Sequence, residues 1–388
     1  MICKTIVEGT TKVLVPIPPK DATFPPSAVP VFYNPEMELN RDINVAATSA
    51  FVERLLSKKK ILREKISYLD AFSASGIRGL RIAGEVGIHA ILNDWSQEAF
   101  EMIKENIKIN GLEEKTLAIH KNANMLLHEK KSHIVDIDPF GTPSPFLDAA
   151  SASVQNMLSV TATDTAPLCG AHLNSGIRKY AAVPLNTEYH SEMGLRVLLG
   201  ACARELAKHE KGMSPLLSHV TRHYVRTYLE ITPGTKQVDR TLKSMGFSIH
   251  CPMCGFRGHV YGLAVYVDKE CPSCNALTQI AGPLWLGSFR EPSFCNEVIS
   301  KIEIYPLNTK NKAKKLIMLC RDELDIPMFY DQHVICKGLK ASATGIKTLI
   351  EALKDNGFEA SRIHFSGTSF RTDAPIFKIK KIIRDLSG

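Results

Sequence analysis

The residues best suited to chemistry follow a short apolar run, His133–Ile137, which has the composition of a buried strand. The run is followed by Asp138-Pro139-Phe140-Gly141, where proline cannot continue a sheet ladder. The Asp138 carboxylate and the Pro139 carbonyl can accept hydrogen bonds from an amine, and the Phe140 ring can stack on a base. An Asx-turn followed by a core phenylalanine is the plainer alternative. If Phe140 is not a core residue, the tetrapeptide predicts a binding site for a flat, polar, amine-bearing target.

Two further aspartates lie at the ends of predicted strands upstream. Asp70 lies near the end of a strand expected over residues 66–72, and Asp94, 24 residues later, ends a strand expected over 89–94. This spacing is one βαβ step, and it places Asp94 where doubly wound folds bind a ribose hydroxyl. In such folds ligands bind at the carboxyl ends of the strands, so we expect Asp70, Asp94 and Asp138 to share one edge of the sheet.

The turn after the first of these strands indicates the type of cofactor. Residues 73–79 read Ser-Ala-Ser-Gly-Ile-Arg-Gly, which is neither the Gly-x-Gly-x-x-Gly fingerprint of nicotinamide cofactors nor a P-loop. A dehydrogenase is therefore disfavoured. S-adenosylmethionine (AdoMet) has no pyrophosphate and suits small residues flanked by acids. The ordered set of Asp70, this turn, Asp94 and Asp138-Pro139-Phe140 predicts AdoMet-dependent transfer of a methyl group to an exocyclic amine.

Strand and helix patterns must alternate to place these residues at one edge. Apolar runs predict the strands, and helices are expected over 77–85 and after Ser96, whose hydroxyl can cap a helix that has Glu98 in its first turn. Repeated βα units indicate an α/β protein with a doubly wound parallel sheet. The five strands are expected over residues 66–72, 89–94, 116–120, 133–137 and 157–164.

The rest of the chain predicts a cover and a second domain. Residues 1–65, with Pro-rich loops over 16–30 and a helix near 42–56, are expected to cover the sheet. The βα rhythm stops after about Ile231. We therefore expect a cofactor-binding domain over 1–230, with the sheet in 66–230, and a smaller α+β C-terminal domain over 231–388. Its last part is expected to be helix, strand and helix over 344–356, 359–365 and 375–385.

Four cysteines predict a metal site. Cys251 and Cys254 form one Cys-x2-Cys pair, and Cys271 and Cys274 form a second after 16 intervening residues. This spacing is typical of one tetrahedral zinc ion held by four thiolates. All four positions would be filled by sulfur, so the ion would be structural rather than catalytic. We expect a zinc-ribbon insert over residues 247–281.

Composition sets broader limits. The 388 residues are 44% hydrophobic and 23% charged, with a net charge of +8, which describes a globular protein that favours an anionic partner. No signal-peptide pattern and no apolar run long enough for a membrane helix is present. We expect a cytoplasmic protein with reduced thiols, no membrane association and no obligate protein partner.

The motifs together resemble those of the tRNA (guanine-N2-)-dimethyltransferases, which modify guanine 26 of tRNA, and most of all those of the archaeal members. The similarity covers nearly the whole chain and continues past the strand-end motifs into its second half. The segments that carry it are 31–35, 39–42, 73–78, 92–94, 136–143, 161–164, 166–170, 178–180, 183–185, 285–287, 329–331 and 364–366.

The resemblance implies a class I AdoMet-dependent methyltransferase fold and roles for further residues. Arg41 and Arg78 would help to hold AdoMet, and Phe32 would border the guanine together with Phe140. The acidic residue that often follows the third strand in the family is replaced by Lys121-Asn122-Ala123. The Asn122 amide oxygen and the Ala123 N–H can still serve the adenine.

The expected partner is tRNA. Arg178 and Lys179 follow soon after the fifth strand and are the best candidates for phosphate contacts, with the zinc-containing domain supplying more. Basic runs at 58–60, 310–315 and 378–384 are each more typical of solvated surfaces. Two alternatives stay open from the sequence: methylation of another nucleic-acid amine (a ribosomal guanine N2 or an adenine N6), and a non-enzymatic zinc-ribbon RNA-binding protein.

Overall fold

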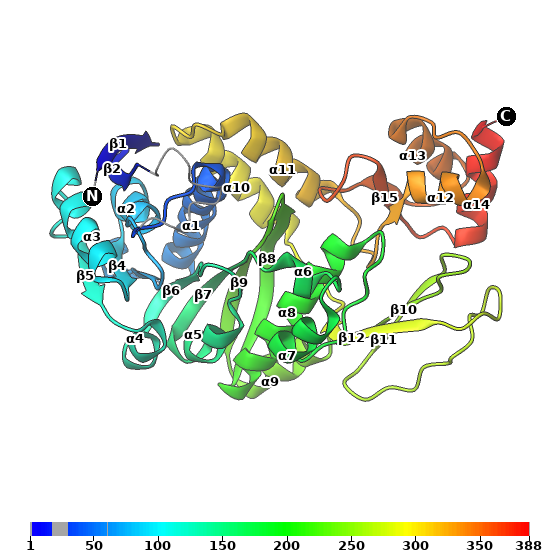
Figure 1. Ribbon diagram of the computed structural model, residues 1–388, viewed down its shortest axis with the longest axis horizontal. Helices are drawn as coiled ribbons and strands as arrows, with labels where there is room; N and C mark the ends of the chain where they lie inside the picture. The colour runs from blue at the N-terminus through cyan, green and yellow to red at the C-terminus, as the bar shows by residue number, and fades with distance from the viewer. Residues whose placement is uncertain (1, 18–29, 60, 388) are drawn as a thin grey trace. The chain divides into compact units, whose positions relative to one another are not determined.

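The computed structural model describes residues 2–17, 30–59 and 61–387 (Figure 1). Most of the predicted Pro-rich loop region lies outside these residues. The chain forms two compact units, one of residues 1–161, 228–232 and 293–318 and one of residues 162–227, 233–292 and 319–388. Within the described residues, no helix is long and apolar enough to cross a membrane.

The main sheet confirms the predicted α/β fold. Its strand order is β5-β4-β3-β6-β7-β9-β8, and β3, β4, β5, β6 and β7 pair in parallel. Two predicted strands have the predicted bounds, and the others differ by one to three residues at an end. The strands are β3 (Ser67–Asp70), β4 (His89–Asp94), β5 (Thr116–His120), β6 (Ser132–Ile137), β7 (Val154–Ala162), β8 (Lys211–Thr221) and β9 (Tyr224–Pro233).

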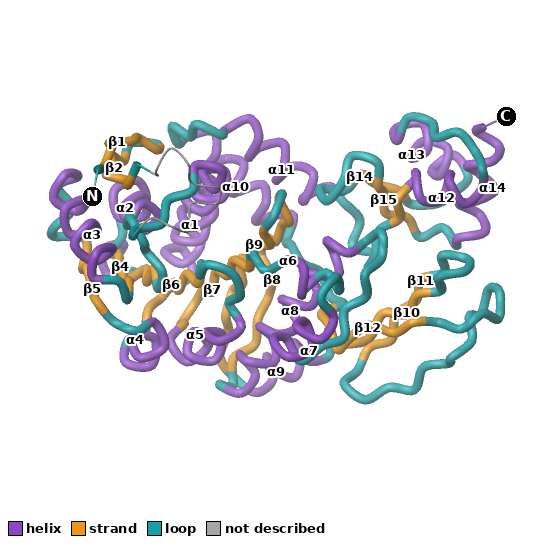
Figure 2. Tube along the Cα trace, in the orientation of Figure 1, coloured by secondary structure: helices purple, strands orange, loops and turns teal. Residues whose placement is uncertain are grey.

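Helices alternate with these strands, as Figure 2 shows by colour. The predicted helix over 77–85 is α2 (Ile77–Arg81) followed by a π-helical turn at Ile82–Val86. The Ser96 hydroxyl accepts a hydrogen bond from the Ala99 N–H (3.3 Å) and caps the next helix as predicted. That helix is α3 (Gln97–Asn110), and α4 (Ala123–Glu129) and α5 (Leu147–Ser153) follow the next two strands.

The first unit also contains the cover and a segment from far along the chain. The cover is the hairpin β1 (Cys3–Glu8) and β2 (Thr11–Pro16) and the helix α1 (Glu38–Lys59), which is longer than predicted. Helix α10 (Pro292–Ile304) and the start of α11 (Lys310–Asp322) return to this unit. The Thr309 hydroxyl and N–H both donate to Asp42 of α1, at 2.6 and 2.8 Å. The sequence did not predict this return.

The second unit holds the zinc-ribbon sheet and the C-terminal elements. Its first helices are α6 (Thr165–Leu168), α7 (Leu173–Tyr180), α8 (His190–Lys208) and α9 (Thr235–Leu242). Strands β10 (Met245–His250), β11 (Arg257–Tyr261) and β12 (Gln279–Trp285) form a sheet of order β11-β10-β12. The last elements are β13 (Tyr330–Asp331), α12 (Gln332–Leu339), α13 (Ile346–Asp355), β14 (Ala360–Arg362), β15 (Ser369–Thr372) and α14 (Ile376–Ser387).

The two units interleave along the chain. Residues 162–227 group with the C-terminal residues, and 293–318 group with the N-terminal residues. The boundaries between the two compact units therefore differ from the predicted domain boundary at residue 230. The functional division into residues 1–230 and 231–388 stays a prediction.

A buried ionic network organises the second unit. Glu192 of α8 accepts hydrogen bonds from Arg196 (2.7 Å) and Arg371 (3.0 Å) and from the backbone N–H groups of Met328 and Phe329. Burial alone would raise the pKa of Glu192, but Arg371 and Arg196 outweigh it and hold the pKa at about 2. Removing one partner of a buried ion pair is strongly destabilising, because it leaves the other charge buried and uncompensated. The network therefore fixes α8, β15 and the turn before β13 to one another.

Candidate active site

Three carboxylates lie at the carboxyl edge of the parallel sheet, as predicted. Asp70 ends β3, Asp94 ends β4, and Asp138 follows directly after β6. Because β3 pairs in parallel with both β4 and β6, with Asp70 opposite Leu92 and Asp136 in the register, these strand ends meet on one side. The fold therefore brings together the residues that the sequence marked separately.

Asp70 is in an unusual electrostatic position. Its side chain is almost fully buried, and burial, aided by the nearby charge of Asp136, raises its pKa to about 7. One carboxylate oxygen accepts from the Phe72 N–H (3.3 Å). The other, Oδ2, has no hydrogen-bond partner within the described structure. A buried acceptor without a partner is costly, and it fits a cationic donor such as the ammonium group of AdoMet.

The turn between β3 and α2 is shaped around Asp94. Its two carboxylate oxygens accept from the backbone N–H groups of Ala74 (2.9 Å) and Ser96 (3.0 Å). Ala74 and Gly76 have positive φ angles, and a Cβ at Gly76 would lie 3.2 Å from Leu92. The turn therefore packs tightly against β4. Each Asp94 oxygen keeps a second lone pair that can accept a ribose hydroxyl.

Asp138 is held by an arginine from α2. Arg78 donates one hydrogen bond to the Asp138 carboxylate and another to the Asn40 amide oxygen (2.9 Å). Arg78 is also 3.9 Å from Asp136 and is mostly buried. Arg78 thus links α1, α2 and the end of β6.

Phe140 is not a core residue. Its side chain is 71% exposed, which excludes the core packing that the alternative interpretation of Asp-Pro-Phe required. The Phe140 and Phe32 rings meet edge to face, with centroids 5.6 Å apart. Gly141 has φ +93°, a conformation that lets the chain turn sharply after the ring. Two aromatic rings from separate segments therefore flank the end of β6.

Arg41 has a partner that the sequence did not predict. It makes a bidentate ion pair with Glu8 of β1, with N–O distances of 2.7 and 2.5 Å, and Tyr33 also donates to Glu8 (2.8 Å). Burial by itself would raise the pKa of Glu8. The hydrogen bonds and charge of Arg41 lower it by a larger amount, so the pKa lies below its usual value. No local signal marks Glu8, because it is a single acid in a short hairpin.

The adenine candidates lie at the start of α4. The Asn122 amide oxygen accepts from the backbone N–H groups of Asn124 (3.0 Å) and Met125 (3.4 Å), so Asn122 is the N-cap of this helix. Ala123 is buried. The role of these two residues in binding adenine stays a prediction.

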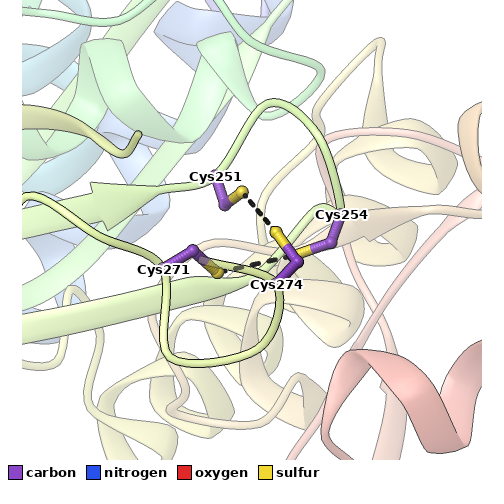
Figure 3. A group of neighbouring side chains, drawn as sticks. All are labelled: Cys251, Cys254, Cys271 and Cys274. Atoms are coloured by element: carbon purple, nitrogen blue, oxygen red, sulfur yellow. Dashed lines mark hydrogen bonds between the residues drawn. The ribbon is translucent and has the colours of Figure 1, made fainter. Parts of the chain in front are cut away.

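The four cysteines of the second unit form one cluster, drawn in Figure 3. The Cys251–Cys274 and Cys254–Cys271 sulfur distances are both 3.6 Å, and all four sulfurs lie within 4.8 Å of one another. Zinc–sulfur bonds of about 2.3 Å in a tetrahedron give sulfur–sulfur distances of about 3.8 Å. The cluster therefore fits one structural zinc ion, as the spacing predicted.

The two halves of the cluster are built alike. The N–H of Cys251 donates to the Phe256 carbonyl, and the N–H of Cys271 donates to the Ala276 carbonyl, five residues on in both cases. Gly255 and Asn275, four residues after these cysteines, both have positive φ angles. Each pair of cysteines therefore sits on the same kind of tight turn.

The predicted phosphate contacts lie on α7 of the second unit. Arg178 is exposed. Lys179 is 3.1 Å from Asp164, which also accepts from the Tyr180 hydroxyl (2.7 Å). Asp164 therefore ties α7 to the segment that follows β7.

Comparison with known proteins places this site in a family. Residues 9–384 match the family described as N2,N2-dimethylguanosine tRNA methyltransferase. The chain belongs to this family. It is 83% identical over 387 residues to a tRNA (guanine(26)-N(2))-dimethyltransferase of Methanosarcina barkeri, and 80% identical over 388 residues to that of Methanosarcina acetivorans, each match covering 100% of both chains.

A solved structure agrees with the family assignment. The complex of Trm1 from Pyrococcus horikoshii with S-adenosyl-L-methionine matches with a TM-score of 0.86 and 34% identity, over 98% of this chain and 99% of that one. The N2,N2-dimethylguanosine tRNA methyltransferase fold thus extends over both compact units. The family resemblance inferred from the motifs is confirmed, as is its archaeal character.

Proposed function

We propose that this chain transfers methyl groups from AdoMet to the exocyclic N2 amine of guanine 26 in tRNA, forming the mono- and then the dimethylated base, in the cytoplasm. The observation that carries the proposal is the exposed Phe140 beside Asp138 and Pro139, at the sheet edge that also holds Asp70 and Asp94, in a chain of this family. An aromatic ring next to two acceptors fits a purine amine.

AdoMet supplies an electrophilic methyl group, and the chain's residues hold the molecule in place. Asp70 would receive its ammonium group, because the buried Oδ2 lacks a partner. Asp94 would accept a hydrogen bond from a ribose hydroxyl of AdoMet. Arg41 and Arg78 would contribute positive charge near the AdoMet carboxylate. Asn122 and Ala123 would contact the adenine. All of these residues belong to the first unit.

Asp138 and the Pro139 carbonyl would orient the guanine amine. The N2 lone pair is delocalised into the ring and is a weak nucleophile, so alignment with the methyl–sulfur bond accounts for much of the rate. As the methyl group transfers, N2 becomes cationic, and the Asp138 carboxylate stabilises this charge and then accepts the proton. Phe140 and Phe32 would border the base, which must first be turned out of its stack.

The second unit would hold the remainder of the tRNA. Arg178 and Lys179 would contact phosphates, and the zinc-binding turns would support the surface around them. Such contacts read charge and shape rather than base sequence. Recognition of a folded RNA by several separated contacts would explain why one guanine is selected.

The direct test is incubation of the purified chain with methyl-labelled AdoMet and bulk archaeal tRNA, followed by nucleoside analysis. We expect label in N2-methylguanosine and N2,N2-dimethylguanosine, both from position 26. Ribosomal RNA serves as the matched control substrate. Label in adenine, or in ribosomal guanine in preference to tRNA, would replace the proposal with one of the other amine targets, and no label in any RNA would support a non-enzymatic role.

A further inference from the structure

Helix α14 leaves an aromatic and cationic face exposed. Its apolar residues Ile376, Ile379, Ile382 and Ile383 are buried in the core that α12 and α13 share. Phe377 is 61% exposed, and Lys378, Lys381 and Arg384 are also exposed. Residues three and four apart lie on one side of a helix. Phe377, Lys381 and Arg384 therefore form a stripe, with Lys378 beside it and its ammonium 5.8 Å from the centre of the Phe377 ring.

This face differs from the other basic runs in that none of its three charges is paired within the described chain, whereas each of the other two runs contains at least one lysine paired with a carboxylate. In the run at 310–315, Lys310 and Lys314 both pair with Glu303, at 3.3 and 2.6 Å. In the run at 58–60, Lys58 pairs with Glu230 at 2.9 Å. By contrast, no carboxylate in the described chain pairs with Lys378, Lys381 or Arg384. The α14 face is thus the basic run best suited to a polyanion.

The zinc cluster directly supports α14 within the second unit. The Lys380 ammonium donates to the carbonyl of the zinc ligand Cys254 (2.7 Å). A Cβ at Gly255 would lie 3.7 Å from Ile376, and Phe256 packs against the core that holds the inner face of α14. The turn of Cys251–Gly255 and the helix therefore form one packed corner.

We propose that the exposed face of α14 is a tRNA-contacting surface and that the zinc site sets its position through the Lys380–Cys254 hydrogen bond. Lys378, Lys381 and Arg384 would contact phosphates, and Phe377 would stack on an exposed base or ribose. Lys380 is then a positioning residue rather than a contact. This inference rests on the proposed function, which makes tRNA the ligand.

The first test measures tRNA affinity of the full-length protein across a salt series. The variant Lys378→Gln/Lys381→Gln/Arg384→Gln should lower the log–log salt slope by about 2 to 3, since each phosphate contact contributes about 0.7–0.9. Phe377→Ala should weaken binding about fivefold or more at fixed salt. The matched control removes three lysines that pair with carboxylates, Lys58→Gln/Lys310→Gln/Lys314→Gln. An α14 variant whose slope equals that of this control, or of the unchanged protein, overturns the proposal.

The second test separates positioning from charge. Lys380→Met should weaken tRNA binding, and Lys380→Arg should restore most of it, with the zinc content and AdoMet affinity of both variants unchanged. Added to the triple α14 variant, Lys380→Met should cause a smaller further loss than it causes alone, because coupled residues are not additive. Equal losses in the two backgrounds would show that Lys380 acts independently of the face.

These measurements fail separately from the proposed function. A protein that methylates no tRNA guanine contradicts the proposed function. A protein that methylates guanine 26 but binds tRNA equally well with and without the α14 charges contradicts only the role of α14.

Discussion

At the scale of single residues, the account depends on Asp138 acting on the amine rather than on the cofactor. Asp138→Asn keeps the shape and one acceptor oxygen but loses the charge that would stabilise the cationic N2. We expect kcat to fall about 100- to 1,000-fold while AdoMet affinity, measured by calorimetry, changes little. Asp355→Asn on the exposed end of α13 is the matched control. An equal loss of AdoMet affinity would assign Asp138 to the cofactor site through its contact with Arg78.

Phe140 carries a second prediction at this scale. Phe140→Ala should reduce kcat/KM on tRNA by a factor that corresponds to about 1–3 kcal/mol of lost stacking. Stability should be nearly unchanged, because the ring is exposed. Phe140→Leu, which keeps apolar bulk but not a flat face, should recover only part of the activity. A thermal unfolding temperature that falls by several degrees with unaltered kinetics would make Phe140 a packing residue.

At the scale of elements, local patterns located the parallel strands well. His89–Asp94 and Thr116–His120 have the predicted bounds, because short apolar runs ending in polar residues are a local signal. The zinc-binding turns were predictable because the Cys-x2-Cys spacing is also a local signal. The β1–β2 hairpin also has a local signal that we did not use, because runs rich in Val, Ile and Thr lie on both sides of the Gly9-Thr10 turn. The Glu8–Arg41 pair has no such signal, because it joins residues 33 positions apart.

The buried network on α8 gives a prediction about pH. Glu192 has a folded pKa of about 2, below its usual 4.5. It therefore contributes stability that is fully present above pH 4.5 and is lost as the pH falls toward 2. We expect the Glu192 contribution, taken as the difference in thermal unfolding temperature between the unchanged protein and Glu192→Gln, to be constant from pH 7 to 5 and to shrink below that. Glu192→Gln should destabilise the protein by about 3–5 kcal/mol. It should also reduce the fall in unfolding temperature below pH 5. If the unfolding temperature of Glu192→Gln fell below pH 5 as much as that of the unchanged protein, other carboxylates would be responsible for the acid sensitivity.

At the scale of the whole molecule, the interleaving of the two compact units decides which experiments are informative. A chain ending near Ile231 would lose residues 293–318, which belong to the first unit and contact α1 through Thr309 and Asp42. The Asp42–Thr309 contact spans 267 residues. Such a return could not be predicted from local sequence, although the cofactor motifs of the site could. Point variants of surface residues are therefore better than truncation for testing which part of the chain binds AdoMet and which part binds tRNA.

The central claim is that the methyl group goes to an exocyclic amine held by Asp138. The most direct measurement compares two tRNA transcripts that differ only at position 26, where one has guanosine and the other has inosine, which lacks the N2 amine. The account predicts methyl incorporation into the guanosine transcript alone, with dissociation constants for the two transcripts within a few-fold of each other. Equal incorporation into the inosine transcript would place the methyl group on another atom and contradict the account.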